Sequence, residues 1–464
     1  MKEKLRDKNL YALELPYKIL YFIFAFFTFC NLTFMKPIMS VAVMVVLVFG
    51  VLVAFPRLYN IKGYLKIPSI FFAVGFLCSY LISAILNYKY GYVDNFKYFI
   101  WMGLHFFTIF ACDVNRSTED YKKEFKVISI FFMGVMFVMS TASLVELCMN
   151  YHLEEYLPTH THLAGLVWGR LWGVFTDPNY GSVFAVLCIL FSVYFFKNNK
   201  NVPFRIFLGV NIFIQIAYMA FSDSRTGLVT LLVCIFMYTL LLGIRNFKFK
   251  KSLNAVVSIG LALVISVTAV AGVTLTKKAG GAVIQKFYEQ TEENTDNKVE
   301  VPQIDDEQRN EDLKNDVSNR RFDIWKSGIE IFSSKPVFGV SYYNIKEYAL
   351  REMPETYLVN NDHGKFSNMH NIIFNILAGQ GVVGILVFLS FAIYSAIYVL
   401  RRLFKLEGED YDYMVILVTC ISACFVASMF VTDVVYVNSP ISLTFWLFLG
   451  YVFHFFKRKE MGKN

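Results

Sequence analysis

Long apolar runs restrict the fold of this chain more than any other feature of its sequence. They recur along most of the 464 residues and are separated by short charged loops. A helix that crosses a bilayer needs about 20 apolar residues, and a helix satisfies its own backbone where no water is present. Composition agrees, because 56% of the residues are hydrophobic and 17% are charged, against roughly 25% charged in soluble proteins. We therefore expect an all-α polytopic membrane protein with about 12 transmembrane helices.

The expected spans follow the apolar runs in chain order. They are residues 18–34, 37–55, 68–86, 98–112, 127–149, 182–196, 206–222, 227–243, 254–275, 371–400, 413–431 and 441–456. The first run has no small-residue cleavage site, so we expect a retained helix and not a removable signal.

Basic residues divide unequally between the two sides of the membrane when the loops are assigned alternately. One side receives 25 Lys and Arg, whereas the short loops opposite hold five. Cytoplasmic loops carry such an excess, so we expect both termini in the cytoplasm. This topology explains the net charge of +8, and nucleic acid is not expected as a partner.

One long hydrophilic stretch, residues 277–369, interrupts the spans and is expected outside the membrane. It separates an N-terminal bundle of about nine helices (1–276) from a C-terminal bundle of about three (370–464). Within it, residues 289–316 contain 11 acidic and three basic side chains. That composition is typical of a flexible segment.

The second part of this loop predicts an amphipathic helix at residues 319–335. Ser318 or Asn319 is suited to cap the helix, and Pro336 is suited to end it. We expect its apolar stripe to lie on the membrane interface or on the mouth of the bundle. The stripe consists of Phe322, Trp325, Ile329 and Phe332.

Polar residues gather in four clusters, all on the expected outer side. One cluster leads into the sixth span, one forms the tight turn between the seventh and eighth, one begins the loop helix, and one opens the tenth span. Their candidate side chains are, in that order, Arg170, Asp177 and Asn179; Ser224 and Arg225; Arg320, Arg321 and Trp325; and His370 and Asn371.

Each cluster also has a structural interpretation. The sequence from Asp177 to Asn179 is good turn chemistry. Arg225 stands where arginines reach lipid headgroups, and His370 has the position of a plain interfacial histidine. Arg320 and Arg321 are placed to pair with the acidic segment upstream. However, Arg225 opposes the charge bias of its side, and the convergence of four clusters on one face favours a functional site.

Several arginines at the headgroup plane suit a pyrophosphate, because a guanidinium binds phosphate oxygens bidentately and stays charged. His370 is suited to accept a proton near neutral pH, as a general base for an attacking hydroxyl. Asp177 and Asn179 are suited to bind sugar hydroxyls. The predicted site acts on a lipid-linked pyrophosphate, with no cofactor and no metal.

Two further motifs have simpler explanations. Gly379 to Gly384 matches the dinucleotide-binding fingerprint but lies inside a predicted membrane helix, so we expect small-residue helix packing there. His160-Thr-His162 lacks the further ligands that a metal site requires.

At these residues the sequence resembles the O-antigen ligase/polymerase superfamily of bacterial membrane glycosyltransferases. The matching pieces occur in one order around one large loop, over roughly residues 165–400. They are Arg170 to Asn179, Ser222 to Gly227, Arg321 to Trp325, Pro336 to Gly339, His370-Asn371, and Gly379 to Gly384. One piece departs from the family pattern, since Ser341 stands where a second glycine is usual.

The resemblance implies an inverting GT-C-type glycosyltransferase that acts on undecaprenyl-diphosphate-linked glycans outside the cytoplasmic membrane. It implies that Arg225 and Arg321 hold the pyrophosphate and that His370 lies near the acceptor hydroxyl. The Arg320-Arg321 doublet leaves the choice of arginine open, and the four-residue spacing to Trp325 favours Arg321.

Our leading interpretation is a polymerase of capsular, exopolysaccharide or O-antigen-type repeat units. A ligase that moves the finished glycan to another acceptor uses the same chemistry and stays an alternative. A 12-span transporter or lipid flippase is a more distant one, because no Lys or Arg lies mid-span and no repeat is evident. Expected partners are the lipid-linked oligosaccharide, the bilayer, and a chain-length regulator and flippase of the same pathway.

Overall fold

The protein is described here by a computed structural model. It describes residues 11–31, 36–157, 160–246, 251–293, 320–362, 364–431 and 434–462. The greater part of the predicted flexible segment and the predicted caps at Ser318 and Asn319 lie outside the described residues. In the structure the N-cap position of the loop helix falls on Arg320.

Each of the predicted spans overlaps a helix. These helices are α2 (Glu14–Thr28), α3 (Lys36–Tyr59), α5 (Ile70–Leu86), α6 (Tyr92–Leu104), α7 (Thr118–Cys148), α8 (Pro178–Asn198), α9 (Val202–Ser222), α10 (Arg225–Asn246), α11 (Lys251–Glu293), α15 (Ile372–Leu403), α16 (Gly408–Ala427) and α17 (Pro440–Glu460). The shorter elements are α4 (Ile61–Tyr64), η2 (Tyr88–Tyr90), the π-helical η3 (His105–Phe110), α13 (Arg321–Ser334) and α14 (Ile345–Glu352).

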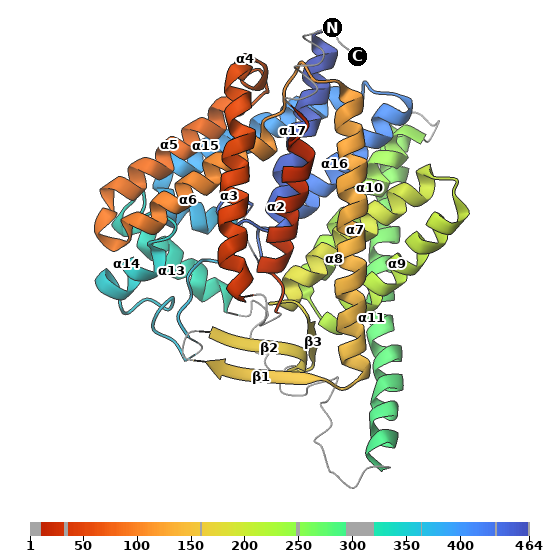
Figure 1. The fold of residues 1–464 in the computed structure, drawn as a ribbon. Coiled ribbons are helices and arrows are strands. Elements are labelled where there is room, and N and C mark those ends of the chain that lie inside the picture. The colour runs from red at the N-terminus through yellow and green to blue at the C-terminus, as the bar shows by residue number, and fades with distance from the viewer. Residues whose placement is uncertain are drawn as a thin grey trace.

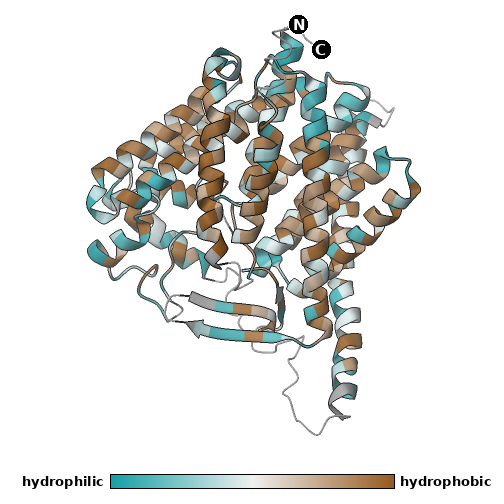
Figure 2. Cartoon of the chain, in the orientation of Figure 1, coloured by the Kyte–Doolittle hydropathy of each residue, from teal (hydrophilic) through white to brown (hydrophobic). Residues whose placement is uncertain are grey.

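Length and composition support a membrane location for most of these helices. Within the described residues, eight are long and apolar enough to cross a bilayer, and α5 is a shorter apolar helix. The eight are α3, α7, α8, α9, α10, α11, α15 and α16. Hydrophobic residues cover the length of these helices, and hydrophilic ones gather toward the ends of the molecule (Figure 2). The chain is a multi-pass membrane protein, and the count of 12 spans stays a prediction.

A three-stranded antiparallel sheet corrects the all-α prediction. Its strands β1 (His152–Leu157), β2 (His160–Val167) and β3 (Arg170–Gly173) pair in the order β1-β2-β3. The sheet connects α7 to α8 and lies across one end of the helical bundle (Figure 1). We call this end of the molecule the sheet end.

At the opposite end, buried ion pairs join the first helix to the rest of the bundle. Glu14 and Lys18 of α2 are each 1% exposed. The Lys18 ammonium donates to Glu124 of α7 at 2.6 Å, and the Arg57 Nη2 of α3 lies 2.8 Å from Glu14 Oε1. Tyr451 of α17 donates to the same Glu124 at 2.8 Å. A buried charge is stable only when it is paired, so this ion cluster holds four helices together.

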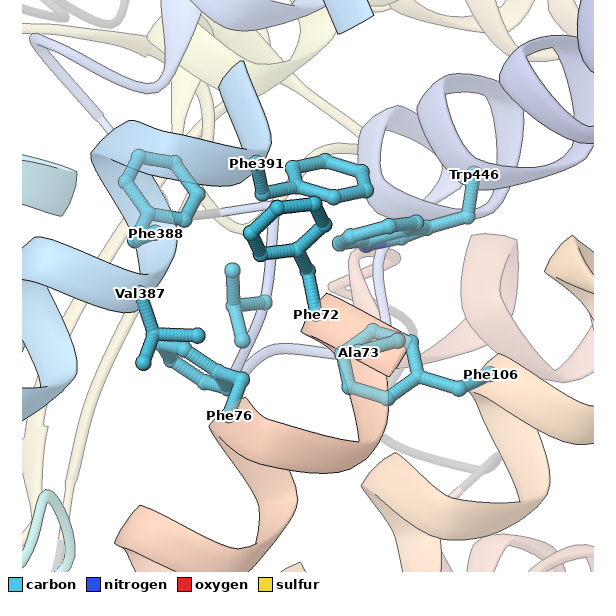
Figure 3. A pocket seen from close by; sticks show the side chains of 9 residues that line it. Phe72, Ala73, Phe76, Phe106, Val387, Phe388, Phe391 and Trp446 are labelled. Carbon is cyan, nitrogen blue, oxygen red and sulfur yellow. The ribbon is translucent and has the colours of Figure 1, made fainter. Parts of the chain in front are cut away.

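Aromatic rings fill the interior between α5, η3, α15 and α17 (Figure 3). The ring centres of Phe76 and Phe388 are 6.3 Å apart, and those of Phe391 and Trp446 are 5.3 Å apart. A void of about 10 Å³ is left among these side chains, which is at the lower limit for one water molecule. The helices therefore pack directly on one another at this level.

A break in α15 joins the long loop to the bundle. Gly381 has φ 63° and ψ −159°, a conformation that is almost restricted to glycine. The break frees backbone groups inside the helix, and the segment after α13 binds them. The Val340 N–H donates to the Ala378 carbonyl at 2.9 Å, and the Val382 N–H donates to the Pro336 carbonyl at 2.8 Å. The glycine motif is thus a docking site for backbone, which refines the expectation of helix packing.

We call this contact, residues 336–341 against residues 378–383, the glycine joint. Ser341 occupies the place in it where the family resemblance expects a second glycine. Its φ is 69°, a left-handed conformation that glycine adopts without strain. The Ser341 hydroxyl donates a hydrogen bond to Asn95 of α6. The left-handed turn is therefore kept with serine, and the side chain adds a bond to the bundle.

The loop helix α13 lies within the predicted range 319–335 but buries a different face from the predicted stripe. Ile324 and Ile331 are 2% and 0% exposed, whereas Phe322 and Ile329 are 67% and 47% exposed. Trp325 of the stripe does pack inward, and its ring stacks on Phe374 of α15 at 5.1 Å. The position of the neighbouring helix α15 determines which face of α13 is buried. The number of apolar residues on a face does not.

Replacement of Gly381 by alanine is expected to open the glycine joint. An added Cβ would lie 2.5 Å from the Val337 carbonyl carbon, in a backbone conformation that costs a side chain about 2 kcal/mol or more. We expect a lower midpoint of thermal unfolding in detergent. Gly209→Ala in α9 is the control, because no atom lies within 4 Å of its added Cβ. Equal midpoints for the two variants would contradict the role of the joint.

Candidate active site

A cavity of about 420 Å³ lies at the sheet end. Its wall is built by the β2–β3 turn, the beginnings of α8 and α13, the residues before α15 and the turn after α16. The lining residues are Trp168, Arg170, Asp177, Asn179, Tyr180, Arg320, Arg321, Ile324, Phe366, His370, Phe430 and Val431. Six residues of the predicted site therefore share one cavity, although they come from segments far apart in the sequence.

The side-chain oxygen of Asn179 is a shared hydrogen-bond acceptor in the part of the wall that carries Arg170. The Nη2 of Arg170 donates to the Asn179 Oδ1 at 2.9 Å, and its Nε donates to the Ser222 carbonyl at 2.9 Å. The Ser224 hydroxyl donates to the same Asn179 oxygen at 2.8 Å. Burial lowers the pKa of the Arg170 guanidinium, while the charge of Asp177 acts in the opposite direction. These bonds tie β3 to the start of α8 and to the α9–α10 turn.

Arg321, on α13, faces the α9–α10 turn. Its Nη2 donates to the Thr226 hydroxyl at 3.4 Å, and its guanidinium carbon lies 5.7 Å from the ring centre of Phe430. Burial lowers the pKa of Arg321, and the positive charge of Arg225 lowers that pKa further. Partly desolvated cations that repel one another are stabilised by a shared anion, so this wall is suited to bind one.

The turn that carries Arg225 is braced from α11. The Lys277 ammonium lies 3.5 Å from Asp223 Oδ2, and Asp223 has the left-handed φ of 47°. Lys277 reaches this turn because α11 continues without interruption to Glu293. The sequence prediction begins the external loop at residue 277, so the helix extends further than expected.

His370 lies immediately before α15, with its backbone at φ 48°. Its Nδ1 is 3.4 Å from the Val431 carbonyl oxygen. Because a carbonyl only accepts, this contact assigns the hydrogen to Nδ1 and leaves the lone pair on Nε2. Burial lowers the pKa of His370, against the opposing effect of Asp177. The imidazole is therefore neutral at pH 7, in the form that accepts a proton.

Asp177 has both a structural and a cavity-lining position. It is the N-cap of α8, and its Oδ1 accepts from the Asn179 N–H at 2.6 Å, with Pro178 in the first helical turn. These residues therefore cap and begin a helix, where the sequence indicated a turn. Asp177 also lines the cavity, where its charge favours the protonated forms of Arg170 and His370.

Four predicted site residues are not among those that line the cavity. Trp325 donates from Nε1 to the Met369 carbonyl at 3.1 Å. Asn371 caps α15 and donates to the Met429 carbonyl at 3.2 Å. Both side chains thereby fix the backbone on either side of His370. The other two residues are Ser224, in the α9–α10 turn, and Arg225, the first residue of α10.

The sequence did not predict the apolar part of the wall. Trp168, Tyr180, Phe366 and Phe430 contribute aromatic rings, and Val431 contributes a carbonyl that also accepts from the Tyr180 hydroxyl at 3.4 Å. Phe430 and Val431 fell inside the predicted span 413–431, whereas α16 ends at Ala427. The early end of that helix turns both residues toward the cavity.

The second His of the His160-Thr-His162 motif has structural partners. The Nδ1 of His162 lies 3.3 Å from Glu155 Oε2, and its Nε2 lies 3.0 Å from the Asn31 carbonyl oxygen. In the described part of the chain, no group of three or more His, Cys, Asp or Glu is arranged to hold a metal ion.

Comparison with known families supports the resemblance. Residues 210–389 match the family model described as O-Antigen ligase. The matched range contains Arg225, Arg321 and His370 but not the Arg170 to Asn179 wall. No curated protein matches the chain. The match confirms the predicted resemblance to the O-antigen ligase/polymerase superfamily, and it indicates glycosyl transfer of the ligase or polymerase type.

Asn179→Ala is expected to loosen the wall of the cavity. The change leaves the Arg170 Nη2 without its Asn179 acceptor, and an unmet buried donor costs about 1–3 kcal/mol. We expect a lower midpoint of thermal unfolding. Asn198→Ala, at the exposed far end of the same helix, is expected to have little effect. A midpoint unchanged in Asn179→Ala would argue against the shared acceptor.

Proposed function

We propose that the chain transfers a glycan from a lipid diphosphate to an acceptor hydroxyl, in the cavity at the sheet end. The observation that carries this proposal is the arrangement of Arg170, Arg320, Arg321 and His370 around one cavity. The likeness to O-antigen ligases over residues 210–389 supports the same chemistry.

Charge supports a diphosphate as the group bound. Three arginines and one carboxylate line the cavity, so the lining is positive overall while His370 is neutral. A diphosphate that links a lipid to a sugar carries one negative charge on each phosphate. Guanidinium groups bind such oxygens bidentately and keep their charge. The bound diphosphate would relieve the repulsion between Arg225 and Arg321.

The proposed reaction is a single displacement at the anomeric carbon. The acceptor hydroxyl oxygen attacks that carbon as its proton passes to Nε2 of His370, and the bond from the carbon to the diphosphate oxygen breaks. The bonding electrons leave with the lipid diphosphate, whose developing charge is stabilised by the arginines. A displacement of this kind inverts the anomeric centre, as expected for a GT-C-type enzyme. Undecaprenyl diphosphate is the lipid carrier that we propose.

We favour polymerisation of surface-polysaccharide repeat units on the outer face of the cytoplasmic membrane. The growing chain would be the donor and a second lipid-linked repeat the acceptor. Ligation of the finished glycan to another acceptor is the second candidate, and the description of the matching family as O-Antigen ligase favours it. A deletion strain separates the two, because loss of a polymerase accumulates single repeats on lipid and loss of a ligase accumulates long lipid-linked chains.

The variants Arg225→Ala, Arg321→Ala and His370→Ala are expected to stop polymer formation. Loss of one charge-stabilising or proton-accepting group lowers such rates by about a hundredfold or more. Gels of surface polysaccharide should lose the long chains, and membrane extracts should accumulate lipid-linked single repeats.

Arg205→Ala is the matched control for these variants. Arg205 lies at the other end of α9 from the site, with its guanidinium carbon 4.3 Å from the ring centre of Phe196. Its replacement should leave polymer length unchanged. Normal polymer in all three site variants, at normal protein levels, would refute the proposed site.

The pH dependence of transfer tests the role of His370. The reaction needs the neutral imidazole, and burial lowers its pKa below the ordinary 6.5. Activity should therefore be complete at pH 7 and fall as the pH drops through the lowered pKa. Asp177→Asn removes a charge that raises this pKa, so the fall should move to still lower pH. A profile of kcat/KM against pH with its acid midpoint above 6.5 would contradict the assignment.

A further inference from the structure

We propose that Trp168 is a stacking platform for a pyranose ring of the glycan, next to the diphosphate site. This inference rests on the proposed function, because it identifies where the sugar of the same lipid-linked substrate lies. Trp168 lines the cavity together with Arg170, two residues later. Its side chain is 49% exposed, so the indole has surface free for a ligand.

The backbone at Trp168 is in a conformation that does not suit tryptophan. Val167 and Arg170 pair across β2 and β3, and Trp168 and Gly169 form the two-residue turn between them. Trp168 has φ 52° and Gly169 has φ 66°. Positive φ at both central residues is the pattern of a type I′ turn, in which Asn or Gly is preferred at the first position. A bulky residue held at positive φ is an outlier of the kind that gathers at functional sites.

Two contacts hold the indole in place. Its Nε1 donates to Glu154 Oε1 on β1 at 3.2 Å. The ring also packs edge-to-face on Trp172 of β3, with ring centres 6.0 Å apart and planes at 85°. A ring fixed in this way loses little conformational entropy when a ligand covers it.

The chemistry of the wall fits a sugar. One face of a pyranose presents C–H groups with slight positive charge, and the indole face carries the negative part of its quadrupole. The hydroxyls at the ring edge would meet the polar groups of Asp177 and Asn179 on the same wall. A lipid chain needs no such polar neighbours. We therefore assign this subsite to the donor sugar that lies nearest to the diphosphate.

The test is binding by the full-length protein in lipid nanodiscs, measured by calorimetry. The probe is a set of oligosaccharides prepared by partial acid hydrolysis of the surface polysaccharide of the source cells. Trp168→Ala should weaken binding about tenfold, whereas Trp168→Phe should stay within about threefold. Trp168→Asn should weaken binding as much as alanine while its thermal midpoint is equal to or above that of the unaltered protein, because asparagine suits the turn.

Tyr92→Ala is the matched control, since Tyr92 is an exposed aromatic residue at the start of α6 that is not among the residues lining the cavity. Its affinity should be unchanged. The proposal is overturned if the unaltered protein does not bind the probe, if Trp168→Ala binds as well as the unaltered protein, or if Trp168→Asn lowers the thermal midpoint. Failure of the subsite is distinct from failure of the transferase, because the calorimetry needs no transfer and the Arg321→Ala phenotype needs no measurement on Trp168.

Discussion

The glycine joint is the contact on which the arrangement of the site depends. A helix that breaks inside a membrane-spanning bundle frees N–H and C=O groups that lipid cannot satisfy. In this protein the residues after α13 satisfy them by backbone hydrogen bonds. The same bonds fix α13 against the first part of α15, and Trp325 adds a bond to the carbonyl just before His370. The glycine joint and the Trp325 hydrogen bond therefore position Arg321 and His370 together.

Charge is distributed over the two ends of the molecule in different ways. At the end that holds Glu14, the buried acids and bases are paired with one another, and these ion pairs hold helices together. At the sheet end, arginines from two segments line one cavity with a single lining carboxylate, Asp177. Burial and mutual repulsion lower the pKa of Arg321. Buried charges without enough partners destabilise the folded protein, and a bound anion offsets that destabilisation.

Much of the helical architecture could be predicted, because apolar length and the absence of water leave a membrane segment few alternatives. The gathering of Arg170, Arg321 and His370 was also predictable, since four polar clusters were expected to converge on one face of the membrane protein. The sheet was missed because strands β1 and β2 show no clean alternation of apolar and polar residues. The buried face of α13 was missed because periodicity does not reveal where the neighbouring helix lies. Helix α13 packs on α15, and it buries Ile324 and Ile331 while the larger Phe322 stays exposed.

The ion cluster has a consequence for how the chain is assembled. Lys18 of α2 and Tyr451 of α17 donate to the same carboxylate on α7. During synthesis the first of these helices enters the membrane long before the last is made. Lys18 meets its acceptor once α7 has been inserted, but that carboxylate lacks its second donor until α17 has been synthesised. The bundle therefore reaches its final packing after translation of α17, and release of a shortened chain leaves the charged end of the first helix incompletely enclosed.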